Sequence, residues 1–125
     1  MTKGISMIKK ATLANAAPGV LLLRVPGICD PADCEQIELI IKQALAAKPR
    51  TVIVDLSAAD SVSTVVLGSL LKLRRGVVAL GGEVRLAGVQ PLVRRVLNIC
   101  RLDQLFNVFS SAEEALSADK TAEMV

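Results

Sequence analysis

The stretch Thr51-Val-Ile-Val-Asp-Leu-Ser-Ala-Ala-Asp-Ser-Val-Ser-Thr64-Val-Val-Leu-Gly-Ser-Leu-Leu71 decides the fold expected of this chain. An apolar run ends at Asp55, a short loop rich in hydroxyl groups follows, and a helical pattern begins near Val65. The first turn of a helix has unpaired backbone N–H groups at the positive end of the helix dipole. The hydroxyls of Ser63 and Thr64 could therefore cap the helix, face a bound anion or carry a phosphate group.

The same alternation of apolar runs and helical patterns continues on both sides of this stretch. Strands are predicted at 5–12, 20–25, 51–56, 84–88 and 106–109, with a turn at 15–19. Helices are predicted from Pro31 to Lys48, from Val65 to Leu80 and from Pro91 to about Cys100, and another follows a capping box at Ser110–Glu113. Strands that alternate with helices predict a single α/β domain over residues 1–125 with a largely parallel sheet. The first strand is expected to lie antiparallel at the edge, the core to span about 5–117, and the tail 118–125 to be flexible.

Composition excludes several classes of function. The chain has 125 residues, of which 52% are hydrophobic and only 2% aromatic, and its net charge is +3. We expect no nucleic-acid binding, because single-stranded readers need aromatic platforms and no basic tail is present. Histidine is absent, which removes the commonest general base and metal ligand, so we expect neither a metal nor a cofactor. The three cysteines form no C-x-x-C pair, which favours a reducing compartment and free, mostly buried thiols.

No motif in the chain predicts catalysis. Glycine-rich phosphate loops are absent, the serines have no base beside them, and helix capping accounts for Asp30 and Asp33. The N-terminal residues do not resemble a signal peptide, and no apolar segment is long enough to span a membrane, so a cytoplasmic protein is expected. The basic residues of two helices, Lys72, Arg74, Arg75, Arg94 and Arg95, fit either a solvated face or a docking face for an acidic partner.

The order of several short motifs resembles the STAS domain of bacterial anti-sigma factor antagonists. These motifs are Leu23-Arg-Val-Pro-Gly27, Val52-Ile-Val-Asp-Leu-Ser57, Leu67-Gly68, Gly81-Gly82, Leu86-Ala-Gly88, Pro91, Val93-Arg-Arg-Val-Leu97, Leu102-Asp-Gln-Leu-Phe106 and Ser111-Ala-Glu-Glu-Ala-Leu116. The resemblance implies one STAS-like domain, with a mixed, mostly parallel sheet and about four helices packed mainly on one face.

The resemblance also points to a functional loop. The family's loop usually reads D-S-S-G-L-G, and the same register here gives Ser63-Thr64-Val65-Val66-Leu67-Gly68. Thr64 falls on the position that a partner kinase phosphorylates in the family, while Ser63, a less favoured acceptor, replaces the aspartate. For Thr64, phosphorylation and a plain helix cap both remain open. Asp30 matches an acidic position that flanks this site.

The function implied is that of an anti-sigma factor antagonist. Such a protein binds an anti-sigma factor that is also a serine/threonine kinase, and this partner switching controls a sigma factor. An alternative is a STAS subunit that binds and regulates the ATPase of an ABC-type lipid transporter, and association with a second copy or another STAS protein is also open. The residues expected to contact the partner are Asp30, Ser57, Ser61, Ser63, Thr64, Val65, Gly68, Lys72 and Arg75.

One further position departs from the family pattern. Family members commonly have a glycine after the helix that begins at Pro91, whereas this chain has Arg101. If that helix ends in a left-handed residue, we expect Arg101 to carry a strain of about 1 kcal/mol.

Overall fold

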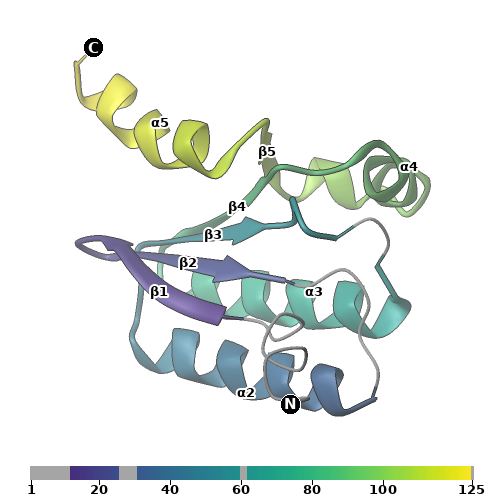
Figure 1. Cartoon of the computed structure of the whole chain (residues 1–125). Helices are drawn as coiled ribbons and strands as arrows, with labels where there is room; N and C mark the ends of the chain where they lie inside the picture. The colour runs from purple at the N-terminus through teal and green to yellow at the C-terminus, as the bar shows by residue number, and fades with distance from the viewer. Residues whose placement is uncertain (1–11, 26–30, 60–61, 125) are drawn as a thin grey trace, which may run out of the picture.

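The computed structural model describes residues 12–25, 31–59 and 62–124, and its strands form one five-stranded sheet in the order β1-β2-β3-β4-β5 (Figure 1). The strands are β1 (Thr12–Ala17), β2 (Val20–Arg24), β3 (Thr51–Asp55), β4 (Glu83–Ala87) and β5 (Asn107–Phe109). The helices of the described residues are α2 (Pro31–Ala46), α3 (Thr64–Ala79), α4 (Pro91–Ile99) and α5 (Ala112–Met124), with a short 3-10 helix, η1 (Leu102–Gln104).

The sheet is mixed and mostly parallel, as the sequence predicted. β1 pairs antiparallel with β2, whereas β2, β3, β4 and β5 pair with one another in parallel. The register places Arg24 beside Asp55 and Asp55 beside Ala87. The carboxyl ends of β2, β3 and β4 therefore meet at one edge of the sheet, where α/β proteins usually place their functional sites.

The predicted strand at 5–12 lies almost entirely outside the described residues, and the first described strand, β1, begins at Thr12. Residues 1–11 are outside the described part, and β1 includes Asn15, which the sequence placed in a turn. The turn is shortened to Pro18-Gly19, where Gly19 has a φ of 75°. Pairing of Asn15 with Leu21 draws the residue into the sheet, because strand pairing overrides a weak local preference for turns.

Alternate residues of each strand face two separate cores. Leu21, Leu23, Val52, Val54 and Leu86 belong to the larger core, which also receives the buried side chains of α2, α3 and α4. The residues between them face the opposite side of the sheet, where α5 packs (Figure 1). This alternation is the two-residue period of a β-strand, and most helices lie on the larger core, as predicted.

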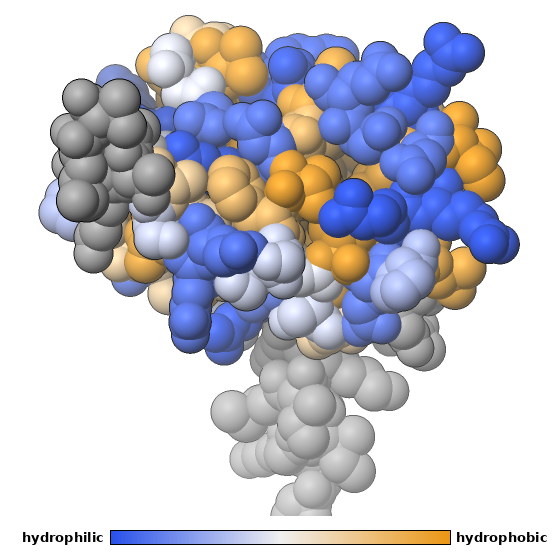
Figure 2. All heavy atoms as spheres, turned by 90° about the horizontal axis from the view of Figure 1, so that it is seen from above, coloured by the Kyte–Doolittle hydropathy of each residue, from blue (hydrophilic) through white to orange (hydrophobic). Residues whose placement is uncertain are grey.

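The second core is smaller and partly open. It consists of the buried residues Val20, Ile53, Ala87 and Ala115, against which Leu22, Phe109 and a few alanines and leucines pack only partly buried. Figure 2 looks onto this side of the molecule and shows apolar surface near its centre, bordered by hydrophilic side chains.

A buried arginine, which the sequence did not predict, lies under α5. Arg85 on β4 is 5% exposed, and its guanidinium donates hydrogen bonds to both carboxylate oxygens of Glu83 and to the carbonyl of Ala115 on α5. The guanidinium also lies 5.8 Å from the centroid of the Phe109 ring. A charge buried beneath a helix is tolerated when it is paired and hydrogen-bonded in this way.

Several predicted details are wrong. Cys100 is an exposed free thiol rather than a buried one, while Cys29 and the side chain of Cys34 lie outside the described residues. On α3, Ser69 is buried and Val78 is exposed, although the helical spacing of the sequence predicts Val78 on the apolar side of the helix and Ser69 on the opposite side.

The last helix also differs from the prediction. The capping box is Ser111–Glu114, one residue later than expected, because the Ser111 Oγ accepts the Glu114 N–H and the Glu114 carboxylate accepts the Ser110 N–H. α5 continues to Met124, beyond the point where the helical period weakens.

The condition stated for Arg101 is met, because the residue is left-handed. Arg101, which directly follows the C-cap of α4, has φ 60° and ψ 25°. A side chain in this region brings Cβ close to the backbone, and glycine alone escapes that contact.

We therefore expect Arg101→Gly to raise the free energy of unfolding by about 0.5–1 kcal/mol, with part of the gain offset by the greater freedom of glycine in the unfolded chain. Thermal denaturation should show a melting temperature a few degrees higher. Arg101→Ala is the matched control, because it removes the same charge but keeps Cβ. Equal stabilisation by both variants would show that charge repulsion, and not backbone strain, is relieved.

Candidate functional site

The side chain of the last residue of β3 stabilises the loop that follows the strand. The carboxylate of Asp55 is nearly buried, and its Oδ1 accepts the backbone N–H of Ser57 at 2.9 Å. Its Oδ2 lies 3.4 Å from the Nε of Arg24, at the end of the neighbouring strand β2. Asp55 therefore both turns the chain and is neutralised in place.

The same loop is held from the β4 side. A Cβ on Gly88, which has a φ of 66°, would lie 2.8 Å from the Cβ of Ser57, so only glycine allows this close approach. The Nε2 of Gln90 donates a hydrogen bond of 2.7 Å to the carbonyl of Ser57, and the Leu56 N–H bonds the Ala87 carbonyl. The roles of Gly88 and Gln90 were not predicted from the sequence, and the glycine at the end of the predicted strand 84–88 was the available signal.

The two adjacent hydroxyl residues at the start of α3 have different roles. Ser63 is the N-cap, since its Oγ accepts the Val66 N–H at 3.2 Å and its carbonyl accepts the Leu67 N–H. Thr64 is the first residue of the helix and is exposed, and within the described part of the chain its hydroxyl makes no hydrogen bond. The interpretation of Thr64 as a plain N-cap is therefore wrong, because Ser63 fills that position.

The other predicted contact residues are spread along the same helix. Val65 is 51% exposed beside Thr64, Gly68 is half-buried, and Lys72 and Arg75 are exposed further along α3. Ser57 is exposed at the start of the β3–α3 loop. The remaining two predicted residues, Asp30 and Ser61, lie outside the described residues.

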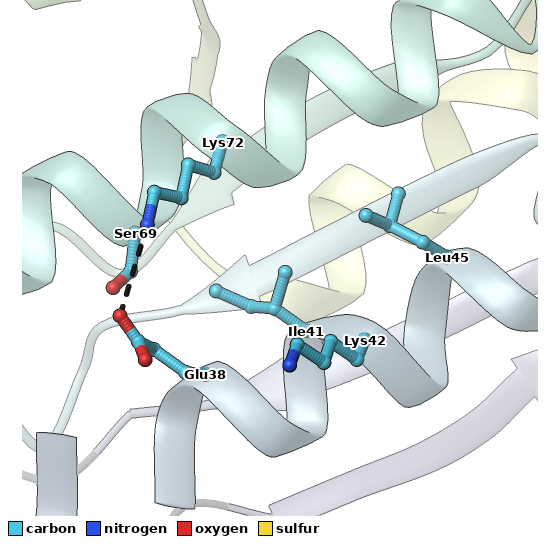
Figure 3. Close-up of a pocket in the computed structure, with 6 residues that line it drawn as sticks. All are labelled: Glu38, Ile41, Lys42, Leu45, Ser69 and Lys72. Atoms are coloured by element: carbon cyan, nitrogen blue, oxygen red, sulfur yellow. Dashed lines mark ion pairs between the residues drawn. The ribbon is translucent and has the colours of Figure 1, made fainter. Parts of the chain in front are cut away.

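Two hollows adjoin this region. Arg24, Asp55, Ser57 and Ala58 line an open hollow of about 320 Å³ at the edge of the sheet. A second hollow of about 280 Å³, the α2–α3 groove, lies between the two helices (Figure 3). Its lining residues are Glu38, Ile41, Lys42, Leu45, Ser69 and Lys72.

The described residues contain no set of ligands for a metal ion, in that no three histidine, cysteine, aspartate or glutamate side chains come together. Among the described helices, none combines the length and the apolar character needed to cross a membrane. The geometry provides an exposed hydroxyl at the start of a helix that Ser63 caps and Val66 and Leu67 anchor in the core, which suits recognition or modification by another protein.

Comparisons with known proteins agree on one family. The model of the STAS domain matches residues 12–115 of this chain. The protein BtrV of Bordetella bronchiseptica, named as a candidate anti-sigma factor antagonist, is 31% identical over 104 residues, which cover 83% of this chain and 90% of BtrV.

Solved structures share the fold. An anti-sigma-factor antagonist (STAS) domain protein from Planctomyces limnophilus has a TM-score of 0.78 at 22% identity, covering 87% of this chain and 97% of its own. The anti-sigma factor antagonist SpoIIAA in its unphosphorylated form has a TM-score of 0.77 at 22% identity, with coverage of 89% and 96%. The Bacillus SpoIIAA in its phosphorylated form has a TM-score of 0.71 at 22% identity, with coverage of 86% and 97%.

The capping assignment makes a prediction about stability. We expect Ser63→Ala to lower the free energy of unfolding by about 1 kcal/mol, because the Val66 N–H loses its acceptor. Ser63→Asp should preserve stability, since aspartate caps equally well, and Thr64→Ala should change it by no more than about 0.5 kcal/mol. Urea denaturation measures all three variants. A larger loss for Thr64→Ala than for Ser63→Ala would contradict the assignment.

Proposed function

This chain belongs to the STAS domain family, and from that premise we propose that it works in a partner-switching pathway that controls a sigma factor. In this proposal it is a non-catalytic cytoplasmic protein that binds an anti-sigma factor which is also a serine/threonine kinase. Binding releases the sigma factor that the kinase had sequestered, and phosphorylation of Thr64 ends the binding. The observation that carries the proposal is the exposed hydroxyl of Thr64 at the first turn of α3, which makes no hydrogen bond within the described part of the chain.

The entrance of α3 can accept a phosphate without disturbing the fold. A phosphate on the first helical residue lies at the positive end of the helix dipole, near backbone N–H groups that the helix itself does not use. The first turn of α3 contains no acidic residue that would repel it. The modification would therefore change the surface that the partner meets rather than the stability of the domain.

Ser63 changes the electrostatics of the entrance. It keeps the capping function that an aspartate performs but brings no charge. The unmodified entrance is thus neutral, and phosphorylation adds about −1.5 to −2 charges at pH 7. A partner surface that fits a neutral entrance would have to bury this new charge, which is unfavourable without a compensating cation.

The relatives support the choice of partner. BtrV is named as a candidate anti-sigma factor antagonist, and SpoIIAA is described both with and without a phosphate. An anti-sigma factor is accordingly the partner to test first.

The test is incubation of the purified chain with ATP and the anti-sigma factor kinase encoded nearest to its gene, followed by measurement of intact mass. We expect one phosphate on the wild-type chain and on Ser63→Ala, and none on Thr64→Ala. Labelling of Thr64→Ala equal to that of the wild type would exclude Thr64 as the acceptor.

Binding gives the second readout. We expect Thr64→Glu to weaken binding of the kinase at least about tenfold, which is about 1.4 kcal/mol, while Thr64→Gln, of similar shape but uncharged, retains most of the affinity. Absence of kinase binding by the wild type, together with binding to the ATPase of an ABC-type transporter, would favour the transporter alternative over this proposal.

A further inference from the structure

The α2–α3 groove exists because the two helices approach closely at one point and leave space beside it. A Cβ on Gly76 of α3 would lie only 2.6 Å from the Cδ2 of Leu45 on α2. The helices can therefore approach this closely only because Gly76 has no side chain. The groove-lining residues of α3, Ser69 and Lys72, precede Gly76 in the chain. The groove therefore opens on the part of α3 that lies toward Thr64.

The charges around the groove favour a negatively charged occupant. α3 carries Lys72, Arg74 and Arg75 and no acidic residue. Lys42 of α2 adds a second ammonium group at the groove, where Glu38 is the one acidic side chain among the lining residues (Figure 3). The rim thus has a net positive charge above the apolar side chains of Ile41 and Leu45.

The acidic residue of the groove is held only weakly. The Oε1 of Glu38 lies 3.8 Å from the Nζ of Lys72, and the two side chains are 50% and 70% exposed. An exposed ion pair of this length is worth little. Lys42 follows Glu38 by four residues on the same helix, which is the spacing at which glutamate and lysine side chains meet. Glu38 can therefore turn to Lys42 when Lys72 is engaged elsewhere.

One hydroxyl that lines the groove makes no hydrogen bond to the described residues, although none of their fully buried polar side-chain atoms lacks a partner. Ser69 is 4% exposed, its side chain lies beside Glu38 and Lys72 in Figure 3, and within the described part of the chain its hydroxyl makes no hydrogen bond. This hydroxyl and the Lys72 ammonium are suitable donors for one carboxylate.

We infer that the α2–α3 groove receives an acidic side chain of the partner protein, flanked by an apolar one, and that Glu38 occupies this place while the chain is free. The inference rests on the proposed function, because the partner is the anti-sigma factor that reads Thr64. Lys72 follows Thr64 by eight residues, or about 12 Å along the helix, so one partner surface can span both. The partner's carboxylate pairs with Lys72 and Ser69, its apolar neighbour packs on Ile41 and Leu45, and Glu38 moves to Lys42.

The test measures the affinity of the unphosphorylated chain for the kinase used above. We expect Lys72→Gln to weaken binding about tenfold. Glu38→Gln should tighten binding about threefold, because the intramolecular competitor is removed. Glu35→Gln is the matched control, since it makes the same charge change at an exposed position of α2 outside the groove lining. A thermal melt of each variant verifies that it is folded.

The outcomes separate this inference from the proposed function. A wild-type chain that does not bind the kinase would overturn both. If the wild type binds and Thr64→Glu weakens binding, but Glu38→Gln behaves like Glu35→Gln and Lys72→Gln like the wild type, only the groove inference is overturned. Tighter binding by Glu38→Gln than by Glu35→Gln, with weaker binding by Lys72→Gln, supports it.

Discussion

The hydrogen bond from the Ser57 N–H to the carboxylate of Asp55 is the interaction on which the candidate site depends. β3 is buried along its whole length and paired on both sides, so Asp55 cannot shift along the sheet. The chain must leave the strand at this point, and the carboxylate determines its direction. Gly88 and Gln90 hold Ser57 from the other side, and the first turn of α3 is anchored by its buried residues Val66 and Leu67.

An exposed hydroxyl on a capped and anchored helix start allows signalling to be separated from stability. Ser63 caps α3, and Val66 and Leu67 pack in the core. Among the described residues, Thr64 contributes to neither the cap nor the core. A group added to Thr64 would alter only what a partner meets. The proposed contacts on α3 then differ in kind, because the one at Thr64 is switched by phosphorylation while the one at Lys72 and the groove is constant. The constant contact contributes affinity whether or not Thr64 is phosphorylated, and the contact at Thr64 determines whether the complex forms.

Much of the fold could be predicted because strands buried on both faces are continuous apolar runs, as in Val52–Val54. β1 could not be placed correctly, since its small uncharged residues, such as Asn15, take their conformation from pairing with β2. The buried Arg85 and Ser69 were missed for a related reason, in that their neighbours come from distant parts of the chain. At the site, the family resemblance indicated Thr64, but adjacent serine and threonine residues fit a helix cap equally well by sequence. Only the hydrogen bond to the Val66 N–H distinguishes them.

The most direct test of the central claim, that the entrance of α3 is the surface which meets the partner, is a map of that surface by NMR. Unlabelled kinase would be titrated into the ¹⁵N-labelled chain, and the change in each backbone amide signal followed. The account predicts that the largest changes fall on residues 62–72 and on Ser57–Ala59, with α5 and β1 nearly unaffected. Changes concentrated on α5 or β1, with the amides of Thr64 and Val65 unmoved, would contradict it.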